Sequence, residues 1–145
     1  MSRLEEARSF RETFGQEMLP NISHYGFIKK KLWSMQLDLV REEASEFLVA
    51  ADEVYADPEN NKRRSELLKE LSDLVFVCHQ FAAAYGLDLD AALRRVYESN
   101  MSKLDEDGKV IYRADGKVLK GPNYEPPNLD GLFPTSNSHY DTHGK

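Results

Sequence analysis

The stretch LWSMQLDLVREEASEFLVA, residues 32–50, decides the fold of this chain. It contains no proline or glycine, and its apolar residues recur at the spacing of one helix face. That face is formed by Leu32, Met35, Leu39 and Ala50. We therefore predict a long helix over about residues 25–55. Glu46 falls near the middle of the apolar face, where a core residue would be expected.

Two short acidic motifs lie on predicted helices: Glu42-Glu43-Ala44-Ser45-Glu46 and Glu70-Leu71-Ser72-Asp73. The second is followed by an apolar run, residues 74–78, which predicts a central buried helix. At ~100° per residue, each motif places its acidic side chains on one side of its helix. Two such helices packed together would aim these carboxylates into one volume, where they repel each other unless cations intervene. Oxygen ligands favour Mg²⁺ or Mn²⁺, ions that serve phosphate chemistry. A solvated acidic face is the alternative for either motif alone.

The rest of the chain divides into further helices and an irregular end. Ser2 and Glu5 form a capping box before a short amphipathic helix, and a loop follows at residues 20–24. Asp57-Pro58 is expected to begin a helix that runs to about Tyr85 and stops at Gly86. Asp88 caps a fourth helix, which ends near residues 100–103.

Beyond the helices, two short apolar stretches, residues 109–113 and 117–120, flank Asp115-Gly116 and predict a small β-hairpin. We expect one all-α domain over residues 1–125, a four-helix, bundle-like fold with this C-terminal hairpin. Residues 126–145 are expected to be irregular and partly disordered. Helices of about 30 residues would extend about 45 Å, beyond what the shorter ones can cover. A homodimer or homotetramer is therefore expected to complete the core.

Composition excludes several classes of function. The chain has 145 residues, a formal net charge of −6 and no apolar run long enough to cross a membrane. The negative charge argues against binding to a nucleic-acid polymer, so neither membrane nor nucleic acid is an expected partner. Cys78, the single cysteine, is expected to be a buried structural thiol, and the chain has the character of a cytoplasmic protein.

The order of these motifs resembles a known superfamily. Glu43-x-x-Glu46 followed by Glu70-x-x-Asp73 is similar to the metal-binding signature of the all-α nucleoside triphosphate pyrophosphohydrolases. These MazG-like proteins include dimeric dUTPases and phosphoribosyl-ATP pyrophosphohydrolase. Ser99-Asn100-Met101-Ser102-Lys103 and the stretch 113–120, RADGKVLK, resemble the segment after the last helix in one subgroup. The resemblance covers roughly residues 30–125.

The resemblance implies hydrolysis of a nucleoside triphosphate to a monophosphate and pyrophosphate. It assigns the metal, two or more Mg²⁺ or Mn²⁺ ions per site, to Glu43, Glu46, Glu70 and Asp73. Glu42 and Glu43 are the expected catalytic residues, with Glu42 orienting or deprotonating the attacking water. The residues expected to bind the substrate are Asn100, Lys103, Arg113, Lys117 and, by stacking on the base, Trp33. Each of these also has an ordinary structural interpretation: a surface lysine or arginine, a helix cap or a core aromatic residue.

The substrate stays open at this point. A deoxynucleoside triphosphate, such as dUTP, dGTP or a damaged nucleotide, is the leading expectation, and phage-borne relatives make a phage origin and a host-cytoplasm location plausible. Phosphoribosyl-ATP is the alternative within the fold. A non-catalytic helical interaction module, stabilised by metal, is the alternative from another class.

Overall fold

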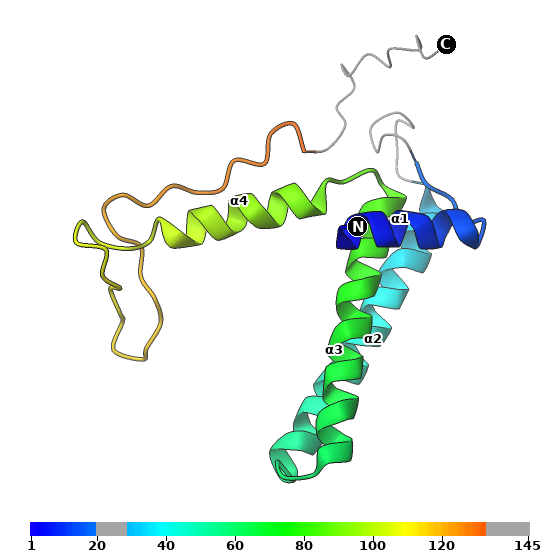
Figure 1. The fold of residues 1–145 in the computed structure, drawn as a ribbon, viewed down its shortest axis with the longest axis horizontal. Coiled ribbons are helices and arrows are strands. Elements are labelled where there is room, and N and C mark those ends of the chain that lie inside the picture. Colours follow the sequence, from blue (N-terminus) through cyan, green and yellow to red (C-terminus); the bar gives the residue numbers. More distant parts are fainter. Residues whose placement is uncertain (20–28, 133–145) are drawn as a thin grey trace. The chain divides into compact units, whose positions relative to one another are not determined.

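The computed structural model describes residues 1–19 and 29–132, which form four α-helices and no β-strand (Figure 1). The predicted all-α class with four helices is confirmed for this part of the chain. The described residues fall into two compact units, one ending at Leu87 and the other spanning Asp88–Leu132. None of the four helices is both long and apolar enough to cross a membrane.

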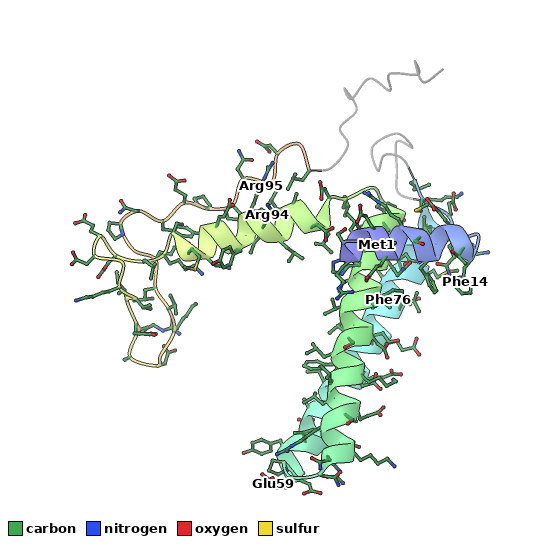
Figure 2. All side chains as sticks on the ribbon, in the orientation of Figure 1. Met1, Phe14, Glu59, Phe76, Arg94 and Arg95 are labelled. Carbon is green, nitrogen blue, oxygen red and sulfur yellow. The ribbon has the colours of Figure 1, made fainter. Side chains whose placement is uncertain are left out.

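Two long antiparallel helices, α2 (Lys30–Ala56) and α3 (Asn61–Ala84), form the frame of the first unit (Figure 1). Glu59 lies in the short turn that joins them (Figure 2). Asn60 caps α3, because its side-chain oxygen accepts a hydrogen bond from the Arg63 N–H at 3.2 Å. The prediction that this helix begins at Asp57-Pro58 is wrong, since Asp57 is instead the residue that ends α2.

The short helix α1 (Arg3–Thr13) packs against α3. The predicted capping box is confirmed. The Ser2 hydroxyl accepts from the Glu5 N–H at 3.2 Å, and the Glu5 carboxylate accepts from the Ser2 N–H at 2.6 Å. Two donors of the first turn are thereby satisfied locally, so this end of α1 was predictable from four consecutive residues.

A buried arginine fastens α1 to both long helices. The Nη1 atom of Arg11 donates to the side-chain oxygen of Gln36 at 3.3 Å and to that of Gln80 at 3.2 Å. Its Nε and Nη2 atoms both donate to the Glu17 carbonyl. Gln80 in turn donates to the Ala7 carbonyl at 3.3 Å. Burial lowers the pKa of Arg11, but these acceptors compensate the buried guanidinium.

One cluster of buried core residues lies at one end of the long helices. Its members are Leu19, Leu32, Ala84 and Tyr85. Trp33 packs on this cluster, with its ring centroid 5.0 Å from Phe81 and 5.2 Å from Tyr85, both in edge-on geometry. Gly86 follows with a φ of 67° and ends α3 as predicted.

The predicted burial of the middle of α3 is wrong for the single chain. Only part of the helix surface is covered, because α1 and α2 are the helices with which α3 shares extensive contacts. Large apolar side chains therefore remain exposed along α3: Leu68, Leu71, Val75 and Phe76. On α2, Leu32 and Ala50 are buried as predicted, whereas Met35 is exposed.

The second unit consists of α4 (Leu89–Met101) and the chain that follows it. Asp88 caps α4 as predicted, accepting from the Ala91 N–H at 3.1 Å. An irregular segment lies against α4. Ser99 donates to the Glu125 carbonyl at 2.7 Å, and Arg95 donates to the carbonyls of Asn128 and Asp130 at 2.9 Å.

The predicted β-hairpin is reduced to a turn. Tyr112 and Val118 form an isolated antiparallel bridge around Gly116, but no strand forms within the described residues. The side chains of both bridge residues are exposed, so no packed face supports a longer ladder. The packing of α4 in a bundle, the domain boundary at residue 125 and the oligomeric core stay predictions. The predicted loop at 20–24 and the tail from 133 onward lie outside the described residues.

Candidate metal centre

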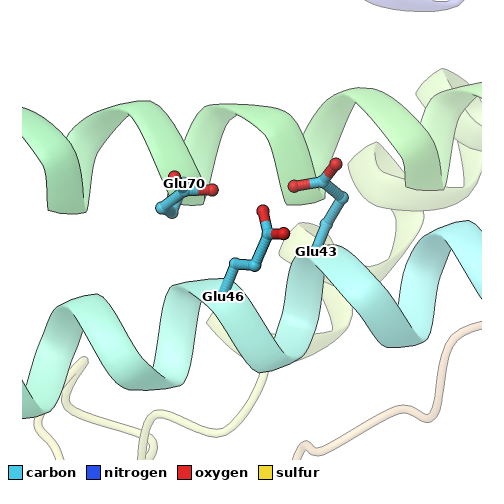
Figure 3. Close-up of side chains that lie close together, drawn as sticks. All are labelled: Glu43, Glu46 and Glu70. Carbon is cyan, nitrogen blue, oxygen red and sulfur yellow. The ribbon is translucent and has the colours of Figure 1, made fainter.

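Three carboxylates meet where α2 faces α3. Glu43 and Glu46 are one turn apart on α2 and extend toward Glu70 on α3 (Figure 3). One carboxylate oxygen from each of the three lies within 4.8 Å of the other two. We call these three residues the carboxylate trio. The structure thus brings together both predicted acidic motifs.

Two oxygens of the trio are buried without a hydrogen-bond partner among the described residues. They are Glu43 Oε2 and Glu70 Oε2. Glu70 is only 6% exposed, which is unusual for a charged residue. A buried carboxylate oxygen without a donor is costly, and it is satisfied by a cation or a proton. The trio is therefore a fitting site for a divalent ion that prefers oxygen ligands.

The charges of the trio are balanced unequally. Burial raises the pKa of Glu43, and the nearby carboxylates of Glu46 and Asp73 raise it further. The pKa of Glu70 is lowered instead, chiefly because its carboxylate accepts a hydrogen bond from Lys69. Without metal, Glu43 on α2 therefore favours protonation, whereas Glu70 on α3 is balanced by the Lys69 ammonium group.

The sequence analysis missed Lys69. Its Nζ lies 2.8 Å from Glu70 Oε1, 3.1 Å from Asp73 Oδ2 and 3.9 Å from a Glu66 oxygen. The hydrogen bonds to Glu70 and Asp73 raise the pKa of the Lys69 ammonium. The sequence did hold a signal, because Lys69 and Asp73 are four residues apart on one helix face. Such pairs are usually surface features, so the spacing alone does not single out this lysine.

Two predicted acidic residues lie outside the trio. Asp73 is half-exposed and paired with Lys69. Glu42 is exposed on α2, immediately before Glu43. Their roles as a fourth ligand and as the water-activating base stay predictions.

A groove of about 280 Å³ opens beside the trio. Its lining residues are Ser45, Glu46, Val49, Ala50, Glu53, Glu66 and Glu70. Four of these are carboxylates, so the groove extends the acidic surface in which cations accumulate. The number of ions held there stays a prediction.

The predicted phosphate-binding residues belong to the second unit. Asn100 lies in the last turn of α4, and Lys103 follows that helix. Arg113 is paired with Asp115 in the turn that replaces the hairpin, which raises the pKa of Arg113, and Lys117 is exposed in the same turn. Their approach to the carboxylates stays a prediction.

The predicted aromatic candidates have different surroundings. Trp33 packs on the core, as described above, and Phe14 is exposed with its ring centroid 4.4 Å from that of Phe10. Tyr25 and Phe27 lie outside the described residues. A base-stacking role for Trp33 therefore stays a prediction beside its observed packing role.

An all-α fold with paired acidic motifs on facing helices is the arrangement of the all-α, MazG-like nucleoside triphosphate pyrophosphohydrolases. Within that superfamily, the chain belongs to the phosphoribosyl-ATP pyrophosphohydrolase family, whose profile matches residues 7–100. The predicted resemblance is thereby confirmed, and the chain is an enzyme, a pyrophosphohydrolase, and not a non-catalytic module. A search of curated proteins finds no match to this chain.

Proposed function

We propose that this enzyme hydrolyses a nucleoside triphosphate to a nucleoside monophosphate and pyrophosphate, with Mg²⁺ or Mn²⁺ held by the carboxylate trio. The observation that carries the proposal is the pair of buried, unpartnered oxygens of Glu43 and Glu70. They occur in a chain whose family consists of pyrophosphohydrolases. A divalent ion bound there would offset the phosphate charge and polarise the α-phosphoryl group.

The chain's own residues would activate the water and hold the leaving group. Glu42 immediately precedes Glu43 in the sequence and would take a proton from a water molecule as the water oxygen attacks the α-phosphorus. The bond from the α-phosphorus to the bridging oxygen breaks, and pyrophosphate leaves. Lys103, Arg113 and Lys117, with Asn100, would hold the departing β- and γ-phosphates and share their charge.

The substrate that the family match supports best is phosphoribosyl-ATP. A deoxynucleoside triphosphate is the second candidate. It is favoured by the segments 99–103 and 113–120, which resemble one MazG-like subgroup and extend beyond the matched residues. The proposed place of action is the cytoplasm, where either nucleotide would be met.

One substrate screen tests both candidates. The purified enzyme is incubated with Mg²⁺ and phosphoribosyl-ATP, or with each natural and modified NTP and dNTP, in ¹⁸O-labelled water. We expect the label in the monophosphate alone, with unlabelled pyrophosphate. Label in orthophosphate would mean attack at the γ-phosphorus and would contradict the proposal. Turnover of dNTPs but not phosphoribosyl-ATP would select the second candidate.

Glu42 is tested separately from the metal ligands. We expect Glu42→Gln to bind Mg²⁺ as the unmodified protein does, in a calorimetric titration, while its kcat falls. The physical reason is that Glu42 is not a member of the trio, although it immediately precedes Glu43 in the sequence. Unchanged kcat with weakened metal binding would make Glu42 a ligand and leave the base unassigned.

We also propose that a second copy of the chain covers the exposed apolar face of α3. A groove of about 510 Å³ lies along this face. Its lining residues are Arg3, Glu6, Leu68, Leu71, Ser72, Val75, Phe76 and His79. An apolar face of this kind on a long helix is typical of a protein interface, and a homodimer or homotetramer would remove it from water.

A further inference from the structure

Lys69 already occupies part of the acidic cluster with a positive charge. Its ammonium group donates to Glu70 Oε1 at 2.8 Å and lies 3.1 Å from Asp73 Oδ2. The lysine side chain is 58% exposed, so it reaches the two carboxylates from the solvent side. The ammonium group could therefore move into water without crossing the packed interior.

Asp73 lies outside the trio and is paired with Lys69. The trio contains one oxygen from each of Glu43, Glu46 and Glu70. Asp73 nevertheless lies close enough for its charge to raise the pKa of Glu43. A fourth carboxylate is therefore present beside the trio and engaged by an internal cation.

We propose that Lys69 is an internal counter-ion of the acidic cluster, and that a divalent metal ion displaces its ammonium group from Glu70 and Asp73. The inference rests on the proposed metal role of the trio. A divalent ion held by these carboxylates would attract them more strongly than an ammonium group does, because it carries twice the charge. It would also repel that ammonium group. Lys69 thus reduces the repulsion among the carboxylates of the metal-free protein and weakens their affinity for metal.

The test is a calorimetric titration of Mg²⁺ and of Mn²⁺ into the full chain and four variants. Lys69→Met removes the competing charge and should tighten metal binding, by up to about fivefold if the pair resembles other exposed ion pairs. Lys69→Arg keeps the charge and should bind metal as the unmodified chain does or more weakly. Lys62→Met is the matched control, since Lys62 lies two turns earlier on α3, outside the groove beside the trio. It should leave the affinity unchanged.

The outcomes separate this inference from the proposed function. If Lys69→Met binds metal equally well or more weakly, Lys69 does not compete with the metal ion and the inference is overturned. If Lys62→Met tightens metal binding equally, the effect comes from the overall electrostatic field of the protein, and the inference is again overturned. Glu70→Gln is the fourth variant, and it should abolish binding. If the unmodified chain binds no metal, the metal role fails along with the inference.

Thermal unfolding gives a second readout. Lys69→Met should have a lower Tm than the unmodified chain in EDTA, because the carboxylates lose their counter-ion. Its rise in Tm on adding Mg²⁺ should be larger, since tighter binding to the folded state stabilises it more. A smaller rise than that of the unmodified chain would contradict displacement.

Discussion

Glu46 is the member of the trio that lies at the centre of the predicted apolar face of α2 and extends toward α3 (Figure 3). We expect Glu46→Gln to lower kcat by roughly a hundredfold or more, because a ligand charge is lost. The same change should raise the free energy of unfolding of the metal-free protein, because one charge leaves a self-repelling cluster. Steady-state kinetics and chemical denaturation in EDTA measure the two effects.

The control for Glu46 is Asp38→Asn, which removes a carboxylate on the same helix. Asp38 is exposed and pairs with Arg41 at 3.0 Å, so its loss should leave kcat unchanged. A Glu46→Gln enzyme that turns over normally, but is less stable without metal, would show that the trio is structural.

Glu43 gives the metal-free protein a distinctive pH dependence. Its folded pKa is raised above the ordinary value of 4.5, so its protonation favours the folded state. That contribution is full below about pH 4.5 and is lost as the pH rises through the folded pKa. Glu43→Gln stays neutral. The variant's advantage in free energy of unfolding over the unmodified chain should therefore grow from pH 4.5 to pH 7 in EDTA. An advantage that does not change with pH would contradict this assignment.

For single residues, the sequence predicts well which side chains converge. It predicts less well which atoms each side chain contacts. The facing of Glu43, Glu46 and Glu70 follows from helix periodicity and from the packing of two long helices. The ion pair between Asp73 and Lys69 does not follow from the sequence, because Lys69 lies within reach of several carboxylates. Long side chains make that choice through small differences in charge and reach, which a spacing pattern does not contain.

At the scale of elements, the start of α3 tests the role of a single cap. Asn60→Ala should lower the free energy of unfolding by about 1 kcal/mol, because the Arg63 N–H loses its acceptor. Asp57→Ala is the comparison. Its carboxylate accepts from the Asn60 side chain at 3.1 Å but caps no backbone N–H at the start of α3, so a smaller loss is expected. Chemical denaturation of both variants would measure the two losses in free energy of unfolding. A larger loss for Asp57→Ala would support Asp57 as the cap, as the sequence predicts.

Caps were predictable where one candidate stood alone. Ser2, Asp88 and Gly86 are isolated signals, and each ends or begins a helix as expected. Asp57 and Asn60 are both good caps three residues apart, and the choice between them depends on where α2 ends. The hairpin failed for another reason. Asp115-Gly116 fixes where the chain reverses, but a ladder also needs a face to pack on.

At the scale of the whole molecule, the exposed apolar face of α3 predicts self-association. The unmodified chain should form a dimer or tetramer in light scattering coupled to size-exclusion chromatography. Val75→Lys places a charge in the groove on that face and should shift the protein toward monomer. Tyr55→Lys is the control, because Tyr55 is also exposed but lies outside the groove. Equal masses for the unmodified chain and Val75→Lys would exclude this face as the interface.

The all-α class was predictable because long amphipathic stretches without proline leave few alternatives. The extent of burial was not, since residues 74–78 are apolar nearly all round and the pattern does not say which neighbour covers each side. The same run is compatible with a core helix in one chain and with a helix shared between two chains.

The buried Arg11 also limits how the N-terminus can be engineered. A truncation that removes α1 would delete the donor that the Gln36 and Gln80 side chains share inside the first unit. The same truncation would expose to water the surface of α3 that α1 covers, including Gln80, so burial is lost together with these hydrogen bonds. A purification tag placed ahead of Met1 leaves this network intact. Trimming the chain to its acidic helices for crystallisation or display would yield a fragment prone to unfolding and proteolysis.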